Sequence, residues 1–532
     1  MRFPVLFLVL PTLALADGLS SPNPGLRHFY ELPPAQSPQT LSVDVCVYGG
    51  SPAGVGAAIQ ARRLGKTAAL AVFRRHVGGL TSAGLTAVDL GKKESIGGLA
   101  AEFLNRMGQW SNFRSGDAES TFRAMLDEAE VPVYYEHRLA RVEKRGRRIV
   151  ALEFENGNRI EARMFIDATY EGDLLAMAGV TFVVGRESNS DYGETYNGYH
   201  MAPAHQFRFP VDPYRTPGDP KSGLLPGISP EPPRPDGSGD KWVQAYNFRM
   251  WLTTAEAGLP FPKPAGYDRD TYALLQRYLT TAPAGFEWDW TYRHGPIRLQ
   301  LGDCNNAGPF STDFIGGSNE WPEADYPTRE KIFQAHVTYQ QGLVWFLAND
   351  EEVPEKIRTH IKKFGLPRDQ FVETNGWPHE LYVREGRRMV SDYVMTEHEC
   401  KGRRVAPDSV CLASYGMDSH HTSRVVVDGK VRAEGDAQYG VPAPYPVSYR
   451  SLVPREEECE NLLVGVCVSS THIAYGSIRM EPVFMMLGQS AATAASLAID
   501  NGVTVQRVDY PTLREQLQRA GQILDWQQPA KP

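Results

Sequence analysis

The sequence predicts an α/β protein in which a mainly parallel sheet lies between two layers of helices. An apolar run at residues 43–48 stops at a glycine pair and leads into a small-residue helix pattern that reaches residue 64, which indicates a buried strand, a tight turn and a helix. A similar unit returns near the C-terminus, as an apolar run at 461–469 and a helix pattern at 482–501. Between these units, residues 185–400 are rich in Pro, Gly, Trp and Tyr, which interrupt helix patterns.

We therefore divide the chain into six segments. Residues 1–16 are expected to form a signal peptide, 17–40 a loose leader, 41–184 and 401–505 the two parts of one core, and 506–532 a C-terminal helix and tail. Residues 185–400 are expected to form an inserted α+β substrate domain, with its clearest helices at 328–349 and 355–364. The first and last apolar strands should lie side by side in the core.

The turn after the first strand predicts a dinucleotide site. Backbone N–H groups at the start of the following helix, together with the helix dipole, would face a pyrophosphate, and Pro52 suits the first helical turn. The dinucleotide fingerprint read from Gly49 has Ser51 in place of its second glycine. Serine is small, and its hydroxyl could bond a phosphate oxygen. The alternative is an ordinary strand–turn–helix of an α/β domain.

A second strand at 67–73 completes a βαβ unit. The acidic residue that usually binds the adenosine ribose at the end of such a strand is replaced by Val72. We therefore expect Arg74, Arg75 or the backbone to hold the ribose. The glycine-rich stretch 76–84 comes next and is either backbone passing close to the same ligand or a surface loop.

Composition restricts the partners and the location. The net charge of −8 over 532 residues shows no basic excess, which argues against a nucleic-acid partner. Arg2, the apolar centre at 5–10 and the small residues at 14–16 are typical of a cleaved secretory signal, with an uncleaved anchor as the alternative. We expect no other stretch to be long enough without charges to span a bilayer, and hence no stable membrane insertion. None of the six cysteines has metal-site spacing, so no metal is expected, and Cys400 could pair with Cys411.

Six motifs, taken in order, resemble those of one family. They are Tyr-Gly-Gly-Ser-Pro-Ala-Gly at 48–54, His-Val-Gly-Gly-Leu-Thr-Ser at 76–82, Asp-Ala-Thr-Tyr-Glu-Gly-Asp-Leu at 167–174, Tyr-Arg-Ser-Leu-Val-Pro at 449–454, Asn-Leu-Leu-Val-Gly at 461–465 and Gly-Ser-Ile-Arg-Met-Glu-Pro at 476–482, with His472 before the last. With these motifs the chain resembles glutathione-reductase-like flavoproteins. It is more closely similar to the secreted or periplasmic FAD-dependent oxidoreductases often labelled xanthan-lyase-like. The likeness is weakest over 185–380.

This resemblance implies a Rossmann-type FAD-binding domain and FAD as the cofactor. It implies a pyrophosphate at 49–54, flavin along 78–82, adenine near Leu139, the ribityl–phosphate region near Ala168 and Asp173, and isoalloxazine near Arg479. Because no second glycine fingerprint for a nicotinamide cofactor is visible, we expect the substrate to supply the electrons. The expected cofactor-binding residues are Gly49, Gly50, Ser51, Pro52, Ala53, Gly54, Arg74, Gly78, Gly79, Leu80, Thr81, Ser82, Leu139, Ala168, Asp173 and Arg479.

Oxidation of an alcohol or amine requires a proton acceptor, for which histidine is suited near neutral pH. Asp418 could orient a neighbouring histidine such as His420, and His472 follows the last apolar strand, at the edge where open sheets bind ligands. We predict that His420 and His472 face the flavin and that Tyr449 and Arg450 hold the substrate. The alternative for each histidine is a structural role.

Two further groups have open interpretations. His76, beside the glycine pair, is an alternative flavin contact or covalent attachment point. The charged residues at 384–388 and 397–399 form either a paired, solvated surface or a substrate-binding strip.

The sequence therefore predicts an exported FAD-dependent oxidoreductase that dehydrogenates a small hydroxylated substrate, such as a sugar, by hydride transfer to flavin. The electron acceptor would be oxygen, a quinone or a protein. Trp and Tyr residues in 185–400 suit sugar faces and aromatic products equally, so a tailoring oxidase of secondary metabolism is the alternative enzyme. A carbohydrate-binding or lyase-type protein with structural FAD is the alternative outside redox chemistry.

Overall fold

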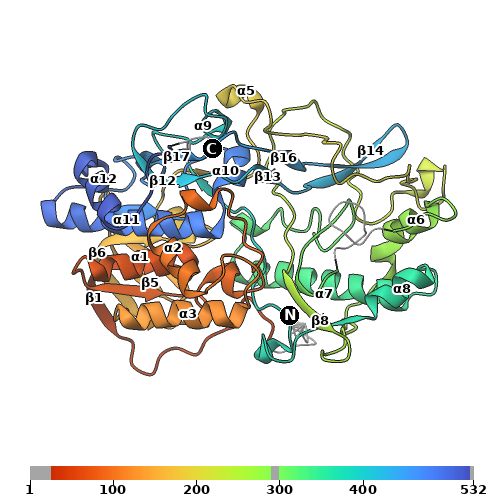
Figure 1. Cartoon of the computed structure of the whole chain (residues 1–532), viewed down its shortest axis with the longest axis horizontal. Helices are drawn as coiled ribbons and strands as arrows, with labels where there is room; N and C mark the ends of the chain where they lie inside the picture. Colours follow the sequence, from red (N-terminus) through yellow and green to blue (C-terminus); the bar gives the residue numbers. More distant parts are fainter. Residues whose placement is uncertain (1–24, 289–298, 528–532) are drawn as a thin grey trace, which may run out of the picture.

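The computed structural model describes residues 25–288 and 299–527. The expected signal peptide, the first part of the leader and the last residues of the tail lie outside this range. A seven-stranded sheet occupies one half of the molecule and helices α6 to α8 lie in the other (Figure 1). The strand order is β3-β2-β1-β6-β5-β4, and β18 also pairs with β6.

The sheet is mainly parallel, as predicted. β1, β2, β3, β6 and β18 run parallel to one another, while β4 and β5 form an antiparallel hairpin whose strand β5 also pairs antiparallel with β6. Their bounds are β1 Thr40–Tyr48, β2 Ala68–Ala71, β3 Val133–Tyr134, β4 Leu139–Arg145, β5 Arg148–Phe154, β6 Arg159–Asp167 and β18 Leu462–Val464. The division of the chain at residues 184 and 400 stays a prediction, but β18 does bring the C-terminal third back to the sheet.

The first and last apolar strands do not lie side by side, and this expectation was wrong. β6 separates them: Val45 of β1 is opposite Met164, and Leu462 of β18 is opposite Phe165. β6 can serve two partners on one side because β5 pairs with its first residues and β18 with its last.

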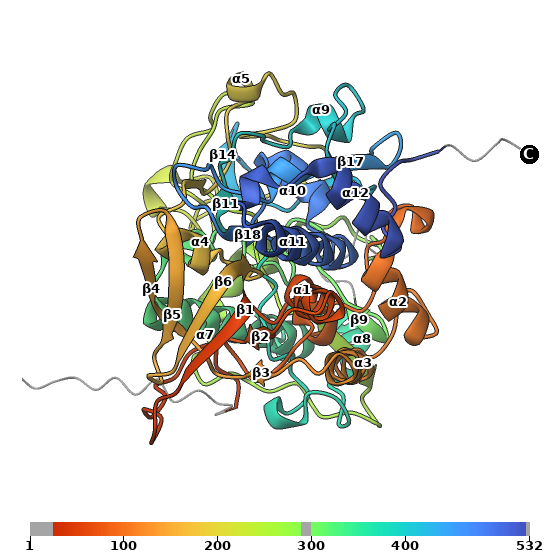
Figure 2. The ribbon, with the colours of Figure 1, turned by 90° about the vertical axis from the view of Figure 1, so that its left-hand side faces the viewer.

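Two helices pack against each other beside the sheet. In Figure 2, α1 (Pro52–Arg63) and α11 (Glu481–Asn501) lie next to each other on the same side of β1 and β6. Glycines allow this approach: a Cβ on Gly488 would lie 1.9 Å from the Ala53 carbonyl oxygen, and one on Gly56 would lie 2.8 Å from that of Met485. The small-residue pattern of both helices therefore reflects close backbone packing.

The other helices are α2 Gly98–Arg106, α3 Ser115–Glu128, α4 Asp173–Met177, α5 Asn189–Tyr192, α6 Ala273–Thr281, α7 Tyr326–Asn349, α8 Glu355–Ile361, α9 Glu397–Cys400, α10 His472–Ile478 and α12 Tyr510–Arg519. Small sheets pair β7 (Phe182–Val183) with β11 (Arg388–Met389), and β8 (Met250–Thr254) with β9 (Gly302–Cys304) and β10 (Phe364–Gly365). Antiparallel pairs join β12 (Ser409–Ala413) to β17 (Tyr445–Ser448), β13 (Met417–Ser419) to β16 (Ala437–Tyr439), and β14 (Ser423–Val427) to β15 (Lys430–Glu434).

Two sequence expectations about the interior need correction. Contrary to the expectation that no second stretch could span a bilayer, α11 is long and apolar enough to do so, but its apolar stretch is entirely buried inside the structure. It is a core helix here. The six cysteines all lie within the described residues and are buried, and Cys400 and Cys411 form no disulfide with each other.

Candidate functional site

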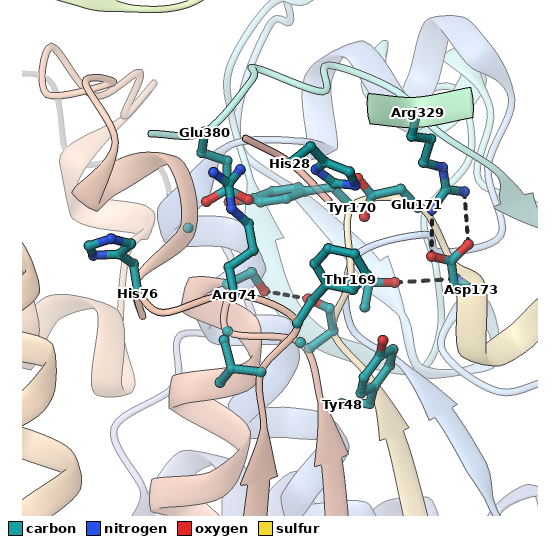
Figure 3. A pocket seen from close by; sticks show the side chains of 17 residues that line it. His28, Tyr48, Arg74, His76, Thr169, Tyr170, Glu171, Asp173, Arg329 and Glu380 are labelled. Atoms are coloured by element: carbon teal, nitrogen blue, oxygen red, sulfur yellow. Dashed lines mark hydrogen bonds and ion pairs between the residues drawn. The ribbon is translucent and has the colours of Figure 1, made fainter. Parts of the chain in front are cut away.

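Two adjacent cavities lie at the carboxyl edge of the sheet. The first, of about 560 Å³, is lined by residues that follow β1, β2 and β6, the edge where open α/β sheets bind ligands. The second, of about 950 Å³, lies past the end of β2. Both volumes include space that is open to solvent. Figure 3 shows the labelled side chains that line the first cavity: His28, Tyr48, Arg74, His76, Thr169, Tyr170, Glu171, Asp173, Arg329 and Glu380.

The turn after β1 has the geometry of a nucleotide-binding turn. Gly49 has a φ of +115°, and a Cβ there would lie 2.5 Å from the Ala168 backbone. A Cβ on Gly54 would lie 1.8 Å from the Gly49 carbonyl oxygen. The Gly49 backbone thus lies in close contact with Ala168, and the Gly54 backbone lies in close contact with Gly49. Neither position has room for a side chain.

Ser51 has a role that its sequence position did not reveal. Its hydroxyl donates to the Ala168 carbonyl at 2.7 Å and accepts from the Gly54 N–H at 3.4 Å. Ser51 therefore caps α1 and joins the β1 turn to the β6 turn. The hydroxyl proton points to the neighbouring turn and not toward the expected phosphate.

The end of β2 is apolar where most dinucleotide sites are acidic. Val72 is buried, lines the first cavity and packs against Gly50, whose Cβ would lie 2.8 Å from a Val72 methyl. Arg74 enters the cavity, and its guanidinium donates to the carbonyls of Arg27 and His379. Its Nη1 is buried without a hydrogen-bond partner among the described residues.

Asp173 is a negatively charged residue in the wall of the first cavity. Arg329 of α7 contacts both of its carboxylate oxygens, at 2.6 and 2.9 Å, and Arg387 contacts it at 2.8 Å. Although burial opposes ionisation, these two guanidinium groups lower the pKa of Asp173. Ala168 lines the same cavity. The N–H of Leu139 donates at 3.1 Å to the hydroxyl of Tyr48, which lines the cavity.

The glycine loop after β2 meets the start of α11. Its 3-10 turn η1 spans Gly79–Ser82, and Gly78 before it has a φ of +94°. Glu481 receives hydrogen bonds from the Thr81 hydroxyl at 3.1 Å and the Tyr170 hydroxyl at 3.0 Å. Burial raises the pKa of Glu481 to about 8 despite these donors. Pro52 and Thr81 line a small third cavity with Glu481.

His420 lies between two carboxylates, that of the buried Asp313 and that of the partly buried Asp418. Its Nδ1 is 2.6 Å from Asp313 and its Nε2 is 3.6 Å from Asp418. Arg384 pairs with Asp313 at 2.9 Å and Arg479 with Asp418 at 2.9 Å. Although burial opposes it, Arg384 and His420 hold the pKa of Asp313 well below its usual value, and His420 and Arg479 do the same for Asp418.

His472 has both ring nitrogens engaged. Nδ1 is 2.7 Å from Glu385, and Nε2 is 3.0 Å from the hydroxyl of Ser419, the neighbour of His420. Gln244 links the two histidines, donating to Glu385 at 3.0 Å and accepting from the His420 N–H at 3.3 Å. Burial lowers the pKa of His472 to about 3, so its ring is neutral at ordinary pH.

The structure does not bring Tyr449 and Arg450 to this cluster. The Tyr449 hydroxyl donates to the Val505 carbonyl at 2.6 Å, and Arg450 pairs with Asp408 at 3.0 Å over the ring of Tyr393. Tyr449 thus ties the end of β17 to the C-terminal segment, and Arg450 ties it to the segment before β12. Tyr449 and Arg450 are therefore not part of the His420–His472 cluster, and their role in holding the substrate stays a prediction.

His76 lies between Glu119 and Glu373, with a nitrogen 3.1 Å from each carboxylate, and stacks on His379 at 3.7 Å between ring centroids. Burial alone would lower its pKa, but the two carboxylates raise it to about 9. A protonated imidazole has no lone pair for a covalent bond to flavin. His76, Glu373 and His379 place ligand atoms within 4.8 Å of one another, but the raised pKa of His76 disfavours the neutral imidazole that a metal ion requires.

Several candidate residues were not predicted from the sequence. Asp313 and Gln244 lie in irregular stretches without a periodic pattern, so no sequence signal pointed to them. Glu385 belongs to the charged group at 384–388, for which a solvated surface was one interpretation. That interpretation was wrong, because Arg384, Glu385 and Arg388 are at most 2% exposed.

The lining of the first cavity fits the ADP part of FAD. It offers the glycine turn at the start of α1, the small residue Ala168, and the buried nitrogens Arg74 Nη1 and His28 Nε2, which have no hydrogen-bond partner within the described chain. Gly49, Gly50, Ser51, Arg74, Gly79, Ala168 and Asp173 line this cavity as expected. The individual roles of all predicted site residues stay predictions.

Comparisons with known proteins support this assignment at the level of the family. A family model described as FAD dependent oxidoreductase matches residues 44–517, and no curated protein matches the chain. Partly similar solved structures include a flavin-containing monooxygenase from Stenotrophomonas maltophilia, with 20% identity, a TM-score of 0.20, and coverage of 28% of this chain and 43% of that one.

An L-proline dehydrogenase from P. horikoshii has 21% identity and a TM-score of 0.20, over 30% of this chain and 26% of that one. A geranylgeranyl bacteriochlorophyll reductase-like protein from Thermoplasma acidophilum has 17% identity and a TM-score of 0.22, over 27% and 43%. The matches span less than two thirds of each of these structures. The family model, however, leaves out only the ends of the chain, and the protein therefore belongs to the FAD dependent oxidoreductase family, with FAD as its cofactor.

Proposed function

We propose that this enzyme dehydrogenates a small hydroxylated molecule, such as a sugar, with His420 as the acceptor of the substrate's proton. The observation that carries this proposal is the placement of His420 between the carboxylates of Asp313 and Asp418. Arg479 connects His420 and its two carboxylates to the glycine-rich loop after β2. It pairs with Asp418 and lies two residues before Glu481, which contacts Thr81 of that loop.

Asp313 would fix the tautomer of His420. An ionised carboxylate only accepts hydrogen bonds, so Nδ1 keeps its proton toward Asp313, and Nε2, 3.6 Å from Asp418, would be the nitrogen that gains and loses a proton. Nε2 would take the proton of a substrate hydroxyl, and the two carboxylates would stabilise the imidazolium, much as an aspartate does in a Ser-His-Asp triad. When bound, FAD supplies the acceptor for the hydride that leaves the substrate carbon, which becomes a carbonyl.

His472 would be a positioning residue in this reaction. Both nitrogens of its neutral ring are hydrogen-bonded, to Glu385 and to Ser419. His472 therefore has no free lone pair for the substrate. It holds Ser419, and with Gln244 the backbone of His420, in place.

The test is anaerobic mixing of the yellow enzyme with sugars, polyols and phenols while the flavin absorbance is followed. Because a general base contributes about 10²- to 10⁴-fold, His420→Asn should slow flavin bleaching by that factor without loss of colour. His360→Gln on α8 is the matched control and should bleach at the wild-type rate. Equal bleaching by His420→Asn and wild type would refute the role of His420.

The same panel separates the alternative functions. Bleaching by phenols alone would favour a tailoring oxidase, and no bleaching by any compound would favour structural FAD. The motifs at 76–82 and 476–482 support membership of the secreted xanthan-lyase-like group within the family.

We also propose that the protein is exported, on the basis of the signal-like pattern at 1–16. N-terminal sequencing of protein secreted by an expressing host should begin at residue 17. Recovery of the intact N-terminus from the cells alone would contradict export.

A further inference from the structure

The segment before the first strand is part of the structured interior. We define residues 25–30 as the N-terminal strap. Leu26 is fully buried and His28 is 7% exposed, although the sequence predicted a loose leader over 17–40. A segment with buried side chains this far from β1 requires specific contacts.

Those contacts come from two distant elements. Glu330 of α7 accepts the backbone N–H groups of His28 at 2.8 Å and Phe29 at 2.7 Å. Arg138, just before β4, donates to the Tyr30 carbonyl and lies over the rings of Phe29 and Tyr30. The strap is thus fixed between α7 and the sheet.

The strap places His28 in the cofactor cavities. His28 lines both cavities, and Figure 3 shows it among the side chains that face the first one. Its ring stacks on Phe73 at 4.9 Å and meets the edge of Trp321 at 4.7 Å. Its Nε2 is buried without a hydrogen-bond partner in the described chain, which is costly for a polar group unless a ligand completes the site.

The chemistry of the surrounding residues defines what His28 would bind. The adenosine ribose of a bound FAD would present hydroxyl donors at the end of β2, where an acidic acceptor is usual and Val72 stands instead. Arg74 cannot accept a hydrogen bond. Asp173 is already paired with Arg329 and Arg387. Burial keeps His28 neutral by lowering its pKa well below the usual value, so one ring nitrogen has a lone pair.

We propose that the N-terminal strap completes the FAD site and that His28 Nε2 accepts a hydroxyl of the adenosine ribose in place of the acidic residue missing at Val72. The FAD site is therefore finished by a segment outside the nucleotide-binding core. This inference depends only on FAD binding and not on the proposed dehydrogenation.

The test compares FAD and FMN binding by the deflavinated enzyme, measured by fluorescence titration. His28→Phe keeps the ring stacking and removes the acceptor, so Kd for FAD should rise about three- to tenfold, the value of one hydrogen bond. Kd for FMN, which lacks the adenosine, should not change. Glu31→Gln, at an exposed position directly after the strap, is the matched control and should bind both as wild type does.

Glu380 and Glu171 are competing acceptors, because both also line the first cavity. A rise in Kd for FAD in Glu380→Gln, with no change in His28→Phe, would overturn the proposal. Equal weakening of FAD and FMN binding by His28→Phe would overturn it as well, since it would indicate a general loss of structure. Circular dichroism of each apoprotein checks that the variants are folded.

Discussion

At the scale of single residues, Glu481 shows how burial decides protonation. Three donors, the Thr81 N–H and hydroxyl and the Tyr170 hydroxyl, point to its carboxyl group, and the N-terminus of α11 also favours a negative charge. Burial outweighs them and raises the pKa to about 8. A carboxyl group beside the expected flavin loop is therefore protonated at neutral pH and can donate a hydrogen bond.

This predicts a pH-dependent stability that Glu481→Gln removes. The folded-state pKa lies above the unfolded value, so the contribution is fully present below about pH 4.5 and is lost as the pH rises toward 8. The loss amounts to at most about 5 kcal/mol in the free energy of unfolding. Urea unfolding at a series of pH values should show this loss in wild type relative to Glu481→Gln. Parallel pH profiles for the two proteins would contradict the assignment.

At the scale of elements, the α1–α11 contact fixes the cofactor turn. α1 begins at the glycine turn and α11 begins at Glu481, and the two helices touch at Gly56 and Gly488. Both helix starts are thereby held at the same edge of the sheet.

Gly488→Ala should separate the two helices, because its Cβ would lie 1.9 Å from a backbone oxygen of α1. We expect a loss of about 3 kcal/mol or more in stability, with release of FAD at a lower temperature. Gly116→Ala is the matched control, since Gly116 lies on helix α3 and a Cβ there would meet no described atom within 4 Å. Its effect on thermal unfolding should stay within about 0.5 kcal/mol. Similar melting of both variants would mean that the helices need not be in close contact.

At the scale of the whole molecule, Asp173 connects the two halves. It begins α4, directly after the β6 turn, and its partners Arg329 and Arg387 belong to the segment predicted as an insertion. The same carboxylate lines the first cavity. Cofactor binding and the packing of the two halves therefore share one buried ion cluster.

Asp173→Asn should lower stability by about 3 kcal/mol, because it leaves two buried guanidinium groups with a neutral partner. Arg215→Gln breaks an exposed pair with Asp270 and serves as control, with an expected effect below about 1 kcal/mol. Chemical unfolding followed by flavin fluorescence and by circular dichroism measures both. Equal stabilities of Asp173→Asn and wild type would show that the ion cluster around Asp173 does not hold the two halves together.

The elements with local signals could be predicted from the sequence. The expected helices at 328–349 and 482–501 are α7 at Tyr326–Asn349 and α11 at Glu481–Asn501. Their periodicity and turn residues act over a few neighbours, so sequence alone is informative. The strand predicted over 461–469 is limited to Leu462–Val464, because only those residues face β6.

The sequence by itself determined the parallel α/β core, the glycine turn of a dinucleotide cofactor and the order of the motifs, because strand, turn and helix signals are local. Only the tertiary structure decided that β6 lies between the first and last strands, that Asp313 from an irregular loop faces His420, and that His28 reaches the cofactor cavities. The physical reason is that these pairings join residues far apart along the chain. They depend on which surfaces pack together, and no local pattern encodes that choice.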